Sequence, residues 1–142
     1  MSRNANNRYV LKVENLKLKL ECKDVFGHLK TDPRTFADSF SVISTHGDCV
    51  SKLPATSLLL GSTPLCENSL FMVGKENNIL CCQSHPEFDL KYAVLDRIWP
   101  KIVDQGGLLS RDEVEESLES FTRYDGVEAR ILCQMISDFL HS

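Results

Sequence analysis

The chain has 142 residues and a formal net charge of −4, and its 42% hydrophobic content is sufficient for the core of one domain. This composition offers no basic surface for nucleic acid or for an anionic membrane, and no apolar run approaches the ~20 residues that cross a bilayer. Segment 1–8 is polar and lacks the apolar core of a signal peptide, so we expect a disordered N-terminus and a cytoplasmic protein.

The first half of the chain has the patterns of β-strands. Alternating apolar residues over 9–21 predict two strands joined by a tight turn at Glu14-Asn15. The following segment, 22–39, gives no clear pattern beyond a short helical turn near Phe36. Four further strands are predicted, over 40–44, 57–61, 69–73 and 79–83. The polar loop 74–78 between the last two indicates a hairpin.

After Pro86 the apolar spacing becomes helical. It runs from Leu90 to Val103, and Pro100 inside it predicts a kink or a break. Ser110 and Glu113 form a capping box that opens a predicted helix to about Thr122. A similar signal at 125–128 precedes a third predicted helix, which reaches Leu140. Strands first and helices last indicate an α+β fold, or one part of a larger three-layer sheet.

The six cysteines form no C-x-x-C pair and no regular spacing. We therefore expect reduced, buried, apolar thiols. A zinc site drawn from His46, Cys49, Cys82 and His85 is conceivable, but the usual ligand spacing is absent. We expect neither a metal nor a cofactor.

The segment 79–88 carries the chemistry of interest. An apolar strand delivers His85 at its end, Pro86 stiffens the turn, and Glu87 follows two residues after the histidine. Histidine can take a proton from a thiol, and a carboxylate on its other nitrogen fixes the tautomer. The alternative interpretation is a strand-end histidine beside a solvated glutamate.

Two motifs resemble one known family. The run 83–88, Gln-Ser-His-Pro-Glu-Phe, is similar to the Q-x-H-P-E-[FY] signature of class I glutamine amidotransferases. The run 46–50, His-Gly-Asp-Cys-Val, followed by Leu53-Pro54, resembles the H-G-D-x-V-x-x-L-P segment that precedes it. The resemblance covers roughly 8–90, and the helical tail is most similar to the γ-glutamyl peptidase-like branch. GMP synthetase glutaminase domains share the His-Gly-Asp segment but continue into a synthetase domain.

The resemblance implies an α/β fold, a flavodoxin-like three-layer domain with a mixed sheet. Segment 9–142 would be its C-terminal portion, with 88–142 as a helical tail. By motif position, His85 would be the catalytic base and Glu87 its orienting carboxylate. His46 and Asp48 would lie beside the site, as structural or substrate-proximal residues. The family's nucleophile is a cysteine in G-x-C-x-G, and no cysteine of this sequence has those neighbours.

We therefore expect a glutamine amidotransferase-like protein for glutamine or a γ-glutamyl small molecule that is inactive alone. An open sheet edge would pair it with a missing N-terminal half or with a second copy. One alternative is a non-catalytic binding or regulatory module that keeps the fold. Another is a separate enzyme in which Cys49 or Cys82 has become the nucleophile.

Overall fold

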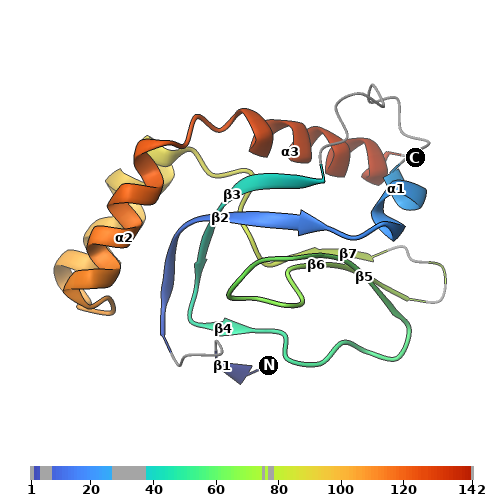
Figure 1. Cartoon of the computed structure of the whole chain (residues 1–142), viewed down its shortest axis with the longest axis horizontal. Coiled ribbons are helices and arrows are strands. Elements are labelled where there is room, and N and C mark those ends of the chain that lie inside the picture. Colours follow the sequence, from blue (N-terminus) through green and yellow to red (C-terminus); the bar gives the residue numbers. More distant parts are fainter. Residues whose placement is uncertain (1, 4–7, 27–37, 75, 77–78, 142) are drawn as a thin grey trace.

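The computed structural model describes residues 2–3, 8–26, 38–74, 76 and 79–141, and it confirms an α/β chain with strands first and helices last (Figure 1). Five strands form one sheet in the order β3-β2-β5-β6-β7, and every neighbouring pair is antiparallel. Their bounds are β2 Val10–Leu18, β3 Ser39–His46, β5 Ser57–Ser62, β6 Leu70–Val73 and β7 Ile79–Cys82. The β6–β7 pairing confirms the predicted hairpin, although most of its loop lies outside the described residues.

The predicted turn at Glu14-Asn15 is wrong, because both residues lie inside the continuous strand β2. β2 pairs with β3 without interruption, from Val10 opposite His46 to Lys17 opposite Ser39. The apolar alternation changes phase at this point because the two halves of β2 pack on opposite faces of the sheet. The sequence pattern reports that change of face, not a reversal of the chain.

Helices cover both faces of the sheet and create two apolar cores. One core joins β2, β3 and β5 to α1 (Glu21–Phe26) and α3 (Val127–Leu140) through residues such as Leu16, Phe40, Leu60 and Leu132. The other joins Leu11 and Ile43 to Val94 and Phe121, on the helices of the opposite layer. Neighbouring residues of β3 therefore face different helical layers, which is the alternation expected of a strand buried on both sides.

The expected break at Pro100 is absent. Wide helical turns run over η2 (Leu90–Ile98) and η3 (Pro100–Gln105), and Trp99 between them is also helical, with φ of −51°, ψ of −50° and its amide bonded to Val94 O. Asp89 caps η2, since its carboxylate accepts a hydrogen bond of 2.8 Å from the Tyr92 amide. Pro100 has no amide hydrogen to donate, so the helical hydrogen-bond pattern lacks one donor at this position.

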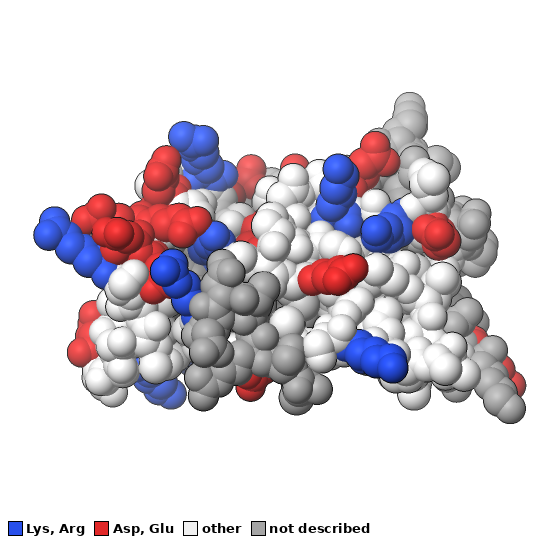
Figure 2. Space-filling view, turned by 60° about the horizontal axis from the view of Figure 1, so that its bottom comes forward, with Lys and Arg blue, Asp and Glu red and all other residues white. Residues whose placement is uncertain are grey.

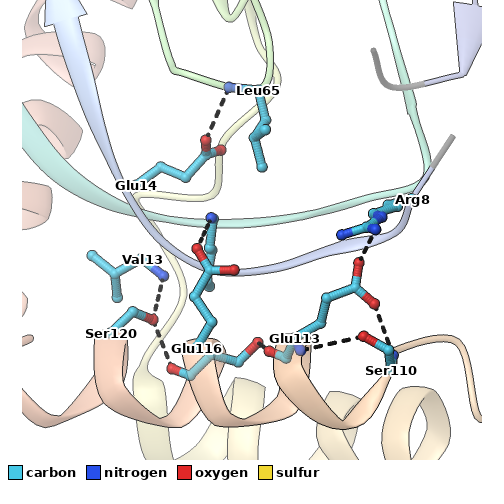
Figure 3. Close-up of polar contacts among 10 residues, drawn as sticks. Arg8, Val13, Glu14, Leu65, Ser110, Glu113, Glu116 and Ser120 are labelled. Carbon is cyan, nitrogen blue, oxygen red and sulfur yellow. Dashed lines mark hydrogen bonds and ion pairs between the residues drawn. The ribbon is translucent and has the colours of Figure 1, made fainter. Parts of the chain in front are cut away.

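Helix α2 (Arg111–Thr122) begins with the predicted capping box, in which Ser110 and Glu113 bond each other's backbone amides. The helix then docks on β2 through polar contacts (Figure 3). The Val13 amide donates to Ser120 Oγ at 3.0 Å, and Lys12 Nζ lies 2.6 Å from Glu116 Oε1. Acidic side chains gather with a few basic ones at the left end of the molecule in Figure 2, over α2. Lys12 of β2 thus neutralises part of an acidic helix.

The second predicted capping box, at 125–128, is wrong. Gly126 precedes α3 with φ of 72°, and the Asp125 carboxylate accepts from the Val127 amide instead. The Glu128 carboxylate accepts a hydrogen bond of 2.6 Å from the Ser41 amide of β3. Glu128 therefore anchors α3 to the sheet rather than capping its own helix.

Three short features complete the described chain. Ser2–Arg3 forms β1, which pairs with β4 (Asp48–Cys49), whereas most of the expected disordered segment 1–8 lies outside the described residues. Helix α1 was not predicted, and the expected helical turn near Phe36 also lies outside the described residues. No described helix combines the length and apolarity that a membrane crossing demands.

Candidate active site

The backbone that follows β7 carries His85 into the sheet. The Gln83 amide donates to Ser69 O at 2.7 Å, and the His85 amide donates to Ile43 O at 2.7 Å. The segment thus leaves β6 and forms an isolated antiparallel bridge with β3 at His85. Backbone hydrogen bonds therefore fix the position of the histidine independently of its side chain.

Ser84 orients this segment through contacts with other buried serines. Its side chain is buried, and its Oγ lies 3.1 Å from Ser69 Oγ and 3.4 Å from Ser44 Oγ. Successive side chains of an extended segment point in opposite directions. An inward Ser84 therefore turns the side chain of His85 away from the serine cluster.

His85 and Glu87 form a hydrogen-bonded pair. His85 Nδ1 lies 2.9 Å from Glu87 Oε1, with the two side chains 31% and 58% exposed. The turn between them is closed by the Phe88 amide, which donates to His85 O at 3.2 Å. The Phe88 ring stacks on the imidazole, with centroids 4.2 Å apart and planes inclined by 10°. The carboxylate and the ring together restrict the imidazole and leave Nε2 to exchange a proton.

His46 and Asp48 lie differently. His46 ends β3 with 7% exposure, and its ring hydrogen-bonds the Asp48 backbone carbonyl. Burial lowers the pKa of His46, the nearby carboxylate of Glu14 opposes that shift, and the charge of His85 adds to it. The Asp48 side chain is exposed on β4. The predicted pair is thus connected through the backbone of Asp48, not through its carboxylate.

The cysteines provide no neighbour for the base. All six are described and free, and none hydrogen-bonds His85. Cys81 and Cys82 lie on β7, and Cys82 Sγ donates to Ser84 O at 3.2 Å. Cys133 lies on α3, where burial raises the pKa of its thiol. Among the described residues, no three His, Cys, Asp or Glu side chains group closely enough to hold a metal ion.

A cavity of about 270 Å³ adjoins Glu87, between the turn after His85 and the start of α3. The Tyr124 hydroxyl is buried there without a hydrogen-bond partner among the described residues, and burial raises its pKa. Arg130 also lines the cavity, together with the carboxylates of Asp89 and Asp125. Room for a small molecule therefore exists beside the His85–Glu87 pair, lined by both acidic and basic groups.

Comparisons with known proteins agree with these motifs. No family model matches the chain. It is 32% identical over 62 residues to gamma-glutamyl peptidase 3 of Arabidopsis thaliana, covering 42% of this chain and 24% of that protein. It is 28% identical over 100 residues to gamma-glutamyl peptidase 2 of the same plant, covering 68% of this chain and 38% of that protein.

A glutamine amidotransferase from Thermotoga maritima superposes with a TM-score of 0.67 at 20% identity. The alignment covers 99% of this chain and 54% of that one. The chain resembles the class I glutamine amidotransferase family in both sequence and fold. It spans about half of the solved amidotransferase chain and less than two fifths of the curated relatives it matches.

Sequence reasoning located His85 and Glu87 on the amidotransferase signature, and the structure brings the two into contact. It missed the stacking of Phe88, for which the aromatic end of the signature was the available signal. It also missed the buried serines and the cavity beside Glu87. These depend on which strands and helices meet, and no single segment of sequence carries that information.

Proposed function

We propose that this chain supplies the His–Glu half of an active site that hydrolyses γ-glutamyl amide bonds, with a cysteine nucleophile brought to His85 by another polypeptide segment. The contact of 2.9 Å between His85 Nδ1 and Glu87 Oε1 is the observation that carries the proposal. It supports a base whose tautomer is fixed and whose imidazolium form is stabilised. The γ-glutamyl peptidase names of the relatives favour a γ-glutamyl substrate, including glutamine itself.

Each residue would have one task. His85 Nε2 accepts the thiol proton as the sulfur attacks the amide carbon, and then returns a proton to the departing amine. Glu87 holds Nδ1–H throughout. Water then attacks the resulting thioester while His85 accepts its proton. His85 returns that proton to the departing cysteine sulfur, and glutamate is released. Phe88 keeps the imidazole plane in place. The buried His46 is a positioning residue of the neighbouring turn, and Asp48 contributes its backbone carbonyl.

The decisive experiment is a chimera. In gamma-glutamyl peptidase 2 of Arabidopsis thaliana, the segment that matches this chain is replaced by this chain, and glutamate release from glutamine and a γ-glutamyl dipeptide is followed. We expect the chimera to be active and its His85→Ala variant inactive, with both soluble and folded by circular dichroism. A folded chimera without activity would contradict the proposal.

The isolated chain is measured in parallel. We expect no glutamate release above that of its own His85→Ala variant, because no cysteine hydrogen-bonds His85. Release that disappears in His85→Ala would mean that a cysteine of this chain completes the site. That result would contradict the requirement for a second segment while preserving the role of the base.

A further inference from the structure

Cys49 and Cys66 come together where β4 approaches the turn that precedes β6. Cys49 ends β4 and is half-buried, whereas Cys66 is 1% exposed in the turn that precedes β6. The Cys49 thiol is close enough to contribute, after burial, to the raised pKa of the Cys66 thiol. Both cysteines are free.

A hydrogen bond from the Asn68 side chain to the backbone holds the two cysteine segments together independently of the sulfur atoms. Asn68, which is 7% exposed, donates from Nδ2 to Val50 O at 2.7 Å. The turn that carries Cys66 is closed by reciprocal bonds with Thr63, at 2.9 Å and 3.3 Å, and by Thr63 Oγ1 at 3.1 Å. The residue after Cys49 is thus tied to the residue two after Cys66. The two thiols lie close together because the segments that carry them are held in place by these hydrogen bonds.

We propose that Cys49 and Cys66 are a modification site at which a small disulfide, oxidised glutathione, converts the two thiols into an intramolecular disulfide. The half-buried position of Cys49 lets it meet the oxidant first. The buried position of Cys66 directly beside it makes Cys66 the residue that resolves the mixed disulfide.

The exchange proceeds in two balanced steps. The Cys49 thiolate attacks one sulfur of oxidised glutathione, which forms a Cys49–glutathione bond and releases one glutathione. Cys66 then loses its proton and attacks Cys49 Sγ, forming the Cys49–Cys66 bond and releasing the second glutathione. The protein loses two electrons and two protons, and both appear on the two glutathione thiols. Burial raises the pKa of Cys66 to about 12, which agrees with its reacting second.

The crosslink would close segment 50–65 into a loop and fix the turn that contacts β2. In that turn the Leu65 amide donates to Glu14 Oε1 at 3.3 Å (Figure 3). Glu14 is 4% exposed, and its carboxylate raises the pKa of His46 against the effect of burial. Oxidation would therefore join the His-Gly-Asp segment covalently to the turn that holds this buried carboxylate.

The test uses the whole chain, incubated with oxidised or with reduced glutathione, then alkylated and digested with trypsin without reduction. We expect a linked pair of peptides, 35–52 joined to 53–75, whose mass separates on reduction. We also expect the urea midpoint to rise after oxidation and to return with dithiothreitol. Cys49→Ser should abolish the link, and Cys133→Ser should leave it unchanged.

Other products would overturn the proposal. These are a stable glutathione adduct on Cys49 without the internal link, or a predominant link between Cys82 and Cys133. Because the peptides are mapped in the unaltered chain, the result does not depend on whether any variant folds.

Discussion

The backbone amide of His85 donates to the carbonyl of Ile43 at 2.7 Å, which joins the candidate base to β3. Ile43 is itself fully buried in the core beneath η2 and α2. The position of the imidazole is therefore linked to the packing of the sheet, whereas its orientation is set by Glu87 and Phe88. Substitutions in the packing around Ile43 should mainly affect stability, whereas substitutions of Glu87 or Phe88 should mainly affect activity.

Glu87→Gln in the chimera should remove the charge that stabilises the imidazolium form of His85 while keeping the side-chain shape. We expect kcat to fall by on the order of 10³-fold to 10⁴-fold, with little change in the unfolding midpoint. Glu67→Gln is the matched control, because Glu67 is an exposed glutamate outside the candidate site. Equal kcat values for the two variants would remove Glu87 from the mechanism.

His46→Gln should change the pH dependence of stability. Burial lowers the pKa of His46 in the folded state, so folding favours the neutral ring. The stabilising contribution is present above the ordinary value of 6.5 and is lost as the pH falls through the lower folded pKa. Glu14, His85 and the Asp48 carbonyl face this ring. The unaltered chain should therefore lose more stability between pH 7 and pH 5 than His46→Gln.

Urea unfolding at these two pH values measures the difference. His141→Gln serves as the control, since His141 is exposed at the end of α3 and its ring bonds the Ser137 carbonyl of the same helix. It should keep the slope of the unaltered chain. If His46→Gln also kept that slope, the buried neutral ring would be the wrong description.

Ser110→Ala should weaken the start of α2. The substitution removes one half of the capping box, and loss of such a cap costs about 1 kcal/mol of unfolding free energy. The Ser110 amide, which donates to the Glu113 carboxylate, lowers the pKa of Glu113. Its contribution is therefore present above the ordinary value of 4.5 and is lost as the pH falls through the lower folded pKa.

The control for the cap is Thr122→Ala at the other end of α2, where the exposed hydroxyl bonds only the Glu119 carbonyl. Its effect on the urea midpoint should be smaller than that of Ser110→Ala. Glu113→Gln should reduce the loss of stability in acid. A steeper acid transition in that variant would contradict the assigned sign.

Leu132→Ala should be among the more damaging substitutions in α3. Leu132 is fully buried against β2, β3 and β5, and truncating a buried leucine costs about 2–5 kcal/mol of unfolding free energy. Leu140→Ala, on the same helix, removes the same atoms from a side chain that is 65% exposed. Chemical denaturation should separate the two variants clearly. Similar midpoints would mean that α3 does not cover the sheet as described.

The strands and helices with local signals were predictable. Ser110 and Glu113 lie within one turn, so the sequence alone placed the cap. The pairing of Glu128 with Ser41 was not predictable, because it joins residues far apart in the chain and replaces a local capping signal. The phase change in β2 was misread for a related reason. Periodicity records which face is buried, but not which element buries it.

The candidate site likewise contains residues that a local motif predicts and contacts that only the fold creates. His85 and Glu87 are two residues apart, so a motif could indicate both of them and their contact. The contact between Cys49 and Cys66 and the serines around Ser84 depend on how separate strands and turns meet. Residue spacing in a single sequence does not predict those contacts. The number and spacing of the cysteines, without the fold, therefore predicted only buried, apolar thiols.

β2 belongs to two cores at once, since Leu11 packs beneath η2 and α2 while Leu16 packs beneath α1 and α3. Neither helical layer can detach without exposing one face of this strand to water. Release of either layer also weakens the hydrogen-bonded frame on which the other rests. The described chain should consequently melt as a single cooperative unit, with its two apolar cores lost together in one transition.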